Sequence, residues 1–369
     1  MLETIIGGGR HARVGYELDD IHLSPTRRTR DEQLVDVSWK LDAYPFDLPV
    51  IGAPSDAVTS PASASTLTRL GGLGVLDLEG LWTRYEDPES VLAELAELPE
   101  GPTATARLQE VYAAEVKEDL IGRRVEELKE AGFAAGCFTP QSVERFHGIA
   151  LEAGLDLLVV QGVAVTAQHV GEDEATPLDL RSFTARYNLP VVVGGVGSAR
   201  SAMHLMRTGA VGVLVGVASS SVATAGSALG LHVPTATAIA EVAAARSRYL
   251  EESGRYVHVI AAGGLRSGGD LAKAAALGAD AAMLGRPLAA ASDSPAPGAY
   301  WGLSAGHVEL PRSRFERIEQ LGSLGAIVNG PAHRDDGQVN LIGGLRRAMG
   351  LTGAEDLAQL REVELVVRG

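Results

Sequence analysis

Cysteine is almost absent from this sequence, since Cys137 is the one thiol in 369 residues. An intramolecular disulfide and a CxxC metal site are therefore both excluded. The histidines show no H-x-x-x-H or H-E-x-x-H spacing, so no zinc site is expected. Cys137 lies between Gly136 and Phe138 in an apolar run, where a single cysteine is typically a small core residue rather than a nucleophile.

Long apolar runs and basic clusters are also missing. No apolar run reaches the length of a membrane span, and the N-terminus has no signal-peptide core, so we expect a cytoplasmic protein without a membrane partner. Only 32 basic residues stand against 47 acidic ones, which gives a formal net charge of −15 and argues against nucleic acid as a partner. A small anionic ligand is not excluded, because helix N-termini hold anions without net positive charge.

Aromatic residues make up 5% of the chain, whereas glycine occurs 44 times, as suits many tight turns between aliphatic strands and helices. Short β-branched runs alternate with amphipathic stretches of helical spacing. The eight runs lie at residues 49–53, 72–76, 133–138, 156–161, 190–195, 211–216, 256–264 and 280–285. Eight strands that alternate with helices predict a single (β/α)8 barrel.

The competing architecture is a doubly wound open sheet, which requires an early dinucleotide-binding fingerprint. The nearest match, residues 194–200, lacks both the final glycine and the later acidic residue, so we reject it. We expect an N-terminal arm over residues 1–47, the barrel over 48–320 and a C-terminal segment packing on the barrel over 321–369. Gly7 to Gly9 follow no convincing strand and are interpreted as a flexible lead-in.

One stretch, residues 211–243, organises the chain. Val211 to Val215 read as a buried strand that enters a loop of small residues, and a helical pattern begins at Ala236. Parallel α/β folds bind ligands where such strands end. The loop resembles the active-site loop of the IMP dehydrogenase/GMP reductase family, G-x-G-x-G-S-x-C-x-T. The positions in register are Gly216, Ser219, Ser221 and Pro234.

The resemblance covers most of the chain. Residues 53–76, 260–295 and 339–349 are similar to the first barrel units, the last barrel units and the closing region of the family. Tyr16 to Pro25 resembles the family's entry segment, which we interpret as an arm that seals the barrel bottom. The regulatory CBS insertion is missing, as in short actinobacterial members. The resemblance implies NAD(P) as a cofactor, a purine nucleotide (IMP, GMP or XMP) as ligand, and a homo-oligomer, either a tetramer or an octamer.

Three loops would form the family's phosphate site. A (β/α)8 barrel commonly binds phosphate with the loops after its seventh and eighth strands. Arg286 replaces the family's serine and would either pair with the phosphate or fill the pocket. The residues that the resemblance assigns to nucleotide binding are Ser219, Ser221, Gly263, Gly264, Leu265, Gly285, Arg286 and Tyr300.

The residues that carry the family's chemistry are replaced. Ala223 stands at the nucleophilic cysteine, Ala225 at the following threonine and Ala262 at the ribose-binding aspartate. The acid that ends the fourth strand is also lost, at Val160 and Gln161, and residues 299–315 lack the family's Arg-Tyr pair. Thr224 is a weak alternative nucleophile, because a hydroxyl needs a positioned base.

Standard IMP dehydrogenase activity is therefore not expected. Two hypotheses follow: a catalytically silent nucleotide-binding relative, or an NAD(P)-dependent oxidoreductase that uses altered chemistry on a purine nucleotide. An unrelated lyase on the same frame stays open, because a fold does not fix a function. The sequence leaves undecided whether the chain is an enzyme.

Overall fold

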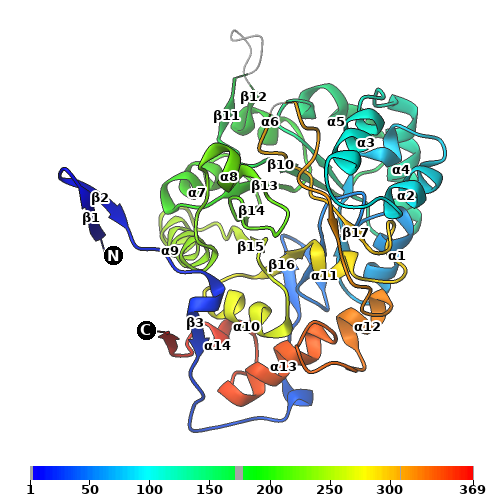
Figure 1. The fold of residues 1–369 in the computed structure, drawn as a ribbon. Coiled ribbons are helices and arrows are strands. Elements are labelled where there is room, and N and C mark those ends of the chain that lie inside the picture. Colours follow the sequence, from blue (N-terminus) through cyan, green and yellow to red (C-terminus); the bar gives the residue numbers. More distant parts are fainter. Residues whose placement is uncertain (1–2, 171–177, 308, 369) are drawn as a thin grey trace.

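The computed structural model describes residues 3–170, 178–307 and 309–368, which fold around a ring of parallel strands (Figure 1). In spatial order the ring consists of β7 (Leu73–Gly74), β6 (Val50–Gly52), β16 (Ala281–Leu284), β15 (His258–Ala262), β14 (Gly212–Val215), β13 (Val191–Val196), β10 (Leu157–Gln161), β9 (Ala135–Phe138) and β8 (Leu76–Asp77). The first and last of these flank Val75 and are two halves of one strand, which closes the ring. The predicted (β/α)8 barrel is confirmed.

The strands form because their residues are β-branched or small and buried on both faces, as parallel sheets require. All six residues of β13 are buried, and Val213 of β14 pairs in register with Val259 of β15. The observed barrel strands coincide with the eight runs that the sequence singles out, except that β8 and β13 each end one residue later, at Asp77 and Val196.

Helices surround the ring, and several begin at a serine whose hydroxyl accepts a backbone N–H of the first turn. Ser198 accepts from Ser201, and Ser267 accepts from Asp270. The helices that cover the barrel are α1 (Pro61–Arg69), α4 (Glu118–Glu130), α5 (Val143–Glu152), α6 (Leu180–Arg186), α7 (Ala199–Met206), α9 (Thr235–Ser253), α10 (Gly268–Ala276) and the pair α11 (Arg286–Ala289) and α12 (Leu324–Asn329).

The connection between β8 and β9 contains helices but no inserted domain. It holds α2 (Pro88–Ala96), α3 (Pro102–Tyr112) and α4. Leu92 and Leu108, from α2 and α3, belong to the same hydrophobic core as the barrel strands.

The N-terminus forms a hairpin of β1 (Glu3–Gly7) and β2 (Arg10–Arg13), which projects from the body in Figure 1. The interpretation of Gly7 to Gly9 as a flexible lead-in is therefore wrong. All three glycines have positive φ, a conformation that glycine adopts at little cost: Gly7 ends β1, and Gly8 and Gly9 form the turn that joins the two strands.

The last strand, β19 (Leu365–Val367), pairs with β3 (Ile21–Leu23), which follows the N-terminal hairpin, on the outside of the barrel. The C-terminal segment also contains α13 (Leu341–Thr352) and α14 (Leu357–Leu360). A short helix, α8 (Ala225–Leu229), follows the loop after β14. Three small two-stranded sheets pair β4 (Trp39–Leu41) with β5 (Tyr44–Phe46), β11 (Gln168–His169) with β12 (Leu178–Asp179), and β17 (Ala299–Tyr300) with β18 (Glu316–Arg317). The three-part division at residues 47 and 320 stays a prediction. Within the described ranges, no helix is long and apolar enough to cross a membrane.

A buried ionic cluster holds Trp301 and Arg312 against the barrel. Arg312 donates to the Asp77 carboxylate at 2.6 Å, and its guanidinium lies 4.0 Å from the ring centre of Tyr112. The Tyr112 hydroxyl donates to Asp56 at 2.5 Å and accepts from the indole N–H of Trp301 at 2.9 Å. Burial raises the pKa of Asp77 to about 7, although the guanidinium of Arg312 opposes that rise.

Replacing Arg312 with Met should destabilise the fold by about 3–5 kcal/mol at pH 8, because the buried Asp77 carboxylate loses the cation with which it is paired. Without the guanidinium the folded-state pKa of Asp77 rises further, so the carboxyl is neutral at pH 5 and the loss should be smaller there. Urea unfolding at the two pH values measures both. The exposed Arg200→Met is the control and should change stability by about 0.5 kcal/mol or less. An equal loss at both pH values would contradict this role of Asp77.

Candidate functional site

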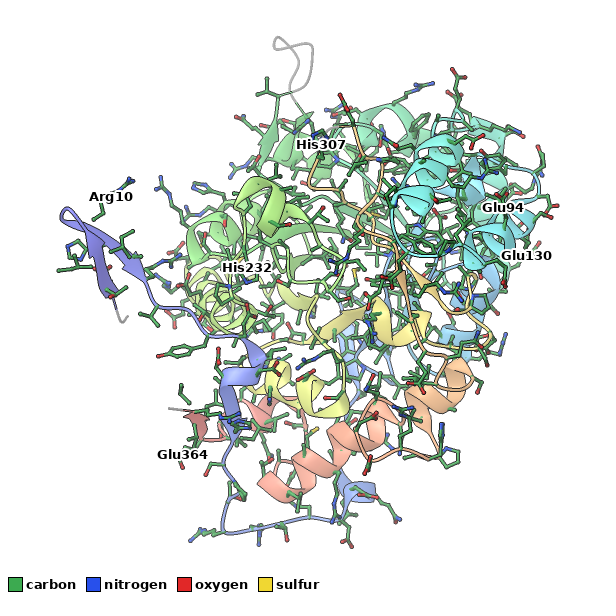
Figure 2. The ribbon with its side chains drawn as sticks, in the orientation of Figure 1. Arg10, Glu94, Glu130, His232, His307 and Glu364 are labelled. Atoms are coloured by element: carbon green, nitrogen blue, oxygen red, sulfur yellow. The ribbon has the colours of Figure 1, made fainter. Side chains whose placement is uncertain are left out.

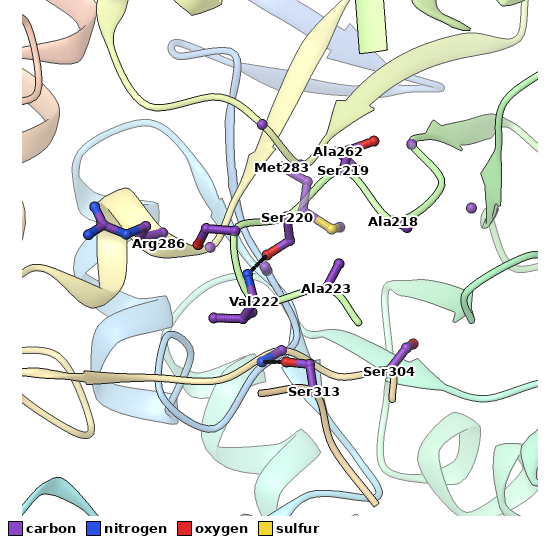
Figure 3. A pocket seen from close by; sticks show the side chains of 18 of the residues that line it. Ala218, Ser219, Ser220, Val222, Ala223, Ala262, Met283, Arg286, Ser304 and Ser313 are labelled. Atoms are coloured by element: carbon purple, nitrogen blue, oxygen red, sulfur yellow. Dashed lines mark hydrogen bonds between the residues drawn. The ribbon is translucent and has the colours of Figure 1, made fainter. Parts of the chain in front are cut away.

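A cavity of about 620 Å³ opens at the carboxyl ends of the barrel strands (Figure 3). Its volume lies in the range of small-molecule sites, and its position is the one where (β/α)8 barrels bind ligands. Every residue that the sequence assigns to nucleotide binding lines it, namely Ser219, Ser221, Gly263, Gly264, Leu265, Gly285, Arg286 and Tyr300.

The loop after β14 is pressed against the end of β15. A Cβ atom on Gly216 would lie 1.9 Å from the carbonyl oxygen of Ala262, so only glycine permits this approach. The approach brings Ser219 into the cavity wall, where its buried hydroxyl has no hydrogen-bond partner in the described part of the chain. Because a buried polar atom without a partner is costly, this hydroxyl marks a place for a polar ligand group.

Backbone N–H groups add to this polar wall. Gly264 has a φ of +77°, which aims the peptide after β15 in a way that other residues rarely allow. Among the described residues, no hydrogen bond uses the N–H of Gly264, Leu265 or Gly285. Free amides from two neighbouring loops suit an anion. The helix α11 that follows Gly285 has only four residues, so it adds little dipole to this wall.

Ser221 and Arg286 converge on a residue that the sequence analysis missed. The Ser221 hydroxyl donates to Oε2 of Glu316 at 3.0 Å, and Nε of Arg286 lies 3.1 Å from Oε1 of the same carboxylate. Figure 3 shows the Arg286 side chain extending away from Ser220 and Ala223. In this structure Arg286 is therefore paired with a carboxylate of the protein, and its pairing with a ligand phosphate stays a prediction.

Tyr300 is buried, and its hydroxyl lies 3.3 Å from the hydroxyl of Ser220. Burial raises the pKa of Tyr300 above its ordinary value, so the phenol is neutral near pH 7. A Cβ on Gly285 would lie 2.3 Å from this phenol oxygen, which places Tyr300 directly over the Gly285 loop.

The nucleophile position is apolar. Ala223 lines the cavity, whereas the neighbouring Thr224 does not, and its hydroxyl accepts the N–H of Gly306 at 2.9 Å. The cavity lining gives no support to Thr224 as a nucleophile, because its hydroxyl is engaged by the backbone of Gly306. Cys137 is fully buried in β9, and burial raises the pKa of its thiol well above the ordinary value.

Part of the segment that begins at Tyr16 lies at the mouth, whereas the sequence analysis expected the segment to seal the barrel bottom. Glu17, Leu18 and Asp19 line the cavity. The Glu17 carboxylate accepts the N–H of Thr235 at 2.9 Å and contacts His232 at 2.6 Å. Thr235 is the first residue of α9, so the carboxylate satisfies the N-terminus of a helix that begins at the mouth.

Gln161, at the end of β10, closes the opposite wall. Its Oε1 is buried without a hydrogen-bond partner among the described residues, and Gly162 and Gly195 lie beside it in the lining. A neutral ligand group with an N–H donor would fit this acceptor. The cavity thus has a charged side at Arg286 and Glu316 and a neutral side at Gln161.

No sequence signal could have found Glu316 or Glu17. Glu316 reaches the site because β18 pairs with β17, which places Glu316 opposite Tyr300, sixteen residues earlier in the chain. Hairpins with such long connections have no short sequence signature. Glu17 reaches it through a contact with His232 that spans 215 positions. Both are long-range contacts that depend on the finished barrel.

Comparison with known proteins identifies the family. The family model described as the IMP dehydrogenase / GMP reductase domain matches residues 15–304. An oxidoreductase of Mycolicibacterium smegmatis described as uncharacterized is 45% identical over 371 residues, covering 98% of this chain and 99% of that protein. An inosine-5'-monophosphate dehydrogenase of Haemophilus influenzae is 34% identical over 246 residues, covering 59% of this chain and 46% of that protein.

The solved structures agree. The crystal structure of an IMP dehydrogenase/GMP reductase-like protein from Corynebacterium glutamicum superposes with a TM-score of 0.92 at 42% identity, covering 99% of this chain and 97% of that one. A family model that spans most of the chain, relatives that match it along nearly the full length and a shared barrel lead to one conclusion. The chain belongs to the IMP dehydrogenase/GMP reductase family of oxidoreductases.

Proposed function

We propose that the mouth cavity binds a purine nucleotide (IMP, GMP or XMP) without the family's cysteine chemistry. The observation that carries this proposal is the pairing, in one cavity, of a polar wall suited to phosphate with a methyl group at the nucleophile position. The wall consists of the free amides of Gly264 and Leu265 and the unpartnered hydroxyl of Ser219. The methyl group is that of Ala223.

The resemblance implies a covalent bond between a cysteine and purine C2, followed by hydride transfer with a nicotinamide. An alanine cannot form that bond, and loss of a covalent nucleophile costs on the order of a millionfold in rate. Cys137 does not replace it, because its side chain is fully buried away from the cavity lining. The proposed role is therefore nucleotide binding by a silent member of an oxidoreductase family.

The alternative is an active NAD(P)-dependent oxidoreductase that uses altered chemistry. One observation favours it: the unpartnered Oε1 of Gln161 would accept an N–H from the neutral carboxamide group of a nicotinamide. A bound nicotinamide would supply hydride transfer, and Gln161 would orient its ring.

We also propose that the chain assembles as a homo-oligomer, a tetramer or an octamer. The exposed N-terminal hairpin supports this assembly. Ile5 and Ile6 are each 67% exposed on a two-stranded sheet, and such an isolated sheet is only marginally stable in water.

The polar wall can be tested with Gly264→Leu. Gly264 is left-handed at +77°, and a side chain there would meet the Ser219 carbonyl at 3.3 Å, so the variant should lose the thermal stabilisation that IMP, GMP or XMP gives the wild type. Gly230→Leu is the matched control: its φ is +69°, but nothing lies within 4 Å of its Cβ, and it should keep the ligand-induced shift. A full shift in the Gly264 variant would place the ligand elsewhere.

The missing nucleophile can be tested by activity. Wild-type protein with IMP and NAD should produce no measurable NADH, and Ala223→Cys alone should give little or no turnover, because Ala262 and residues 299–315 lack the other family groups. Mass spectrometry should nevertheless trap an adduct between the new thiol and a 6-chloropurine nucleotide. Rapid NADH production by the wild type, unaffected by an alkylating agent, would favour the oxidoreductase alternative instead.

A further inference from the structure

A carboxylate of the protein lies where the phosphate site was expected. Both oxygens of Glu316 are engaged, one by the Ser221 hydroxyl at 3.0 Å and one by Arg286 at 3.1 Å. Both partners are residues that the resemblance assigns to the nucleotide phosphate. The Glu316 side chain is 21% exposed and lines the mouth cavity, so the contact lies at the edge of the site and is open to exchange.

The surroundings hold Glu316 in this position. It belongs to β18, which pairs with β17 so that Glu316 lies opposite Tyr300. Arg314, which precedes this strand, donates to the Ser221 carbonyl at 2.7 Å and so connects the chain leading into β18 to the loop after β14. The Glu316 carboxylate therefore takes the place of a ligand phosphate between the side chains of Ser221 and Arg286.

We propose that Glu316 is an internal competitor for the ligand's phosphate, an autoinhibitory contact that lowers the affinity of the cavity for phosphorylated purines but not for the corresponding nucleosides. The inference rests on the proposed nucleotide function. A phosphate that reached Ser221 and Arg286 would either displace the carboxylate or bind beside a like charge, and both cost binding free energy. A ligand without a phosphate leaves the contact between Glu316 and Arg286 intact.

Arg286 is the cation for which the Glu316 carboxylate and a ligand phosphate would compete. While it is paired with Glu316, its charge is neutralised and adds little attraction for an incoming anion. When the carboxylate is removed or displaced, the guanidinium becomes available for a paired contact with two phosphate oxygens. The pair thus sets the selectivity between a phosphorylated and an unphosphorylated ligand.

The test is calorimetry on the full-length protein with inosine 5′-monophosphate and with inosine. Glu316→Gln keeps the shape of the side chain and removes its charge, so Kd for the monophosphate should fall by about tenfold or more while Kd for inosine changes less than about twofold. Glu319→Gln removes the same charge three residues away from an exposed pair with Arg334 and should leave both constants unchanged. Adding Arg286→Met to Glu316→Gln should abolish the gain.

A second measurement guards against a folding defect. Inorganic phosphate should raise the thermal midpoint of Glu316→Gln or Glu316→Ala more than that of the wild type. If the wild type binds the monophosphate and neither variant binds it more tightly, Glu316 does not compete with the phosphate, and the proposed nucleotide function stands. Equal gains for nucleotide and nucleoside would also overturn it. If no form binds either ligand, the proposed function and this inference both fail.

Discussion

The closed ring of parallel strands is the constraint on which the rest of the molecule depends. Because all the strands run in the same direction, their carboxyl ends meet at one mouth, and residues far apart in the sequence come to line one cavity. The ring closes only because β7 and β8 continue each other across Val75. Without closure, the loops after β14, β15 and β16 would not share a wall.

Close packing at the mouth then sets what the cavity offers. Gly216 allows the loop after β14 to touch the end of β15, and that contact buries the Ser219 hydroxyl without a partner. Gly302 and Ser313 help to complete the mouth, and the neighbouring Arg312 is held by its buried pair with Asp77. The polar groups available to a ligand are thus positioned by the close contact between the loop after β14 and the end of β15, and by an ionic cluster outside the cavity.

The fold was largely predictable from the sequence, and the site only in part. Short buried runs such as Val191–Val196 indicate barrel strands, because their apolar pattern is local in the sequence. The family resemblance placed residues such as Gly264 and Arg286 on the loops at the mouth. The role of Arg286 was not predictable, because its partner Glu316 comes from a separate hairpin. Glu17 was assigned to the barrel bottom because only the finished barrel shows the N-terminus of α9 that it satisfies. The N-terminal hairpin was missed because Gly7 to Gly9 dominate its pattern.

The account depends on a cavity that retains a phosphate wall and lacks a nucleophile. The most direct measurement is a crystal structure of the protein with inosine 5′-monophosphate. We expect the phosphate within hydrogen-bond distance of the N–H groups of Gly264 and Leu265, and purine C2 facing the Ala223 methyl without a covalent bond. A phosphate bound outside the mouth cavity, or a covalent bond between the purine and any side chain, would contradict the account.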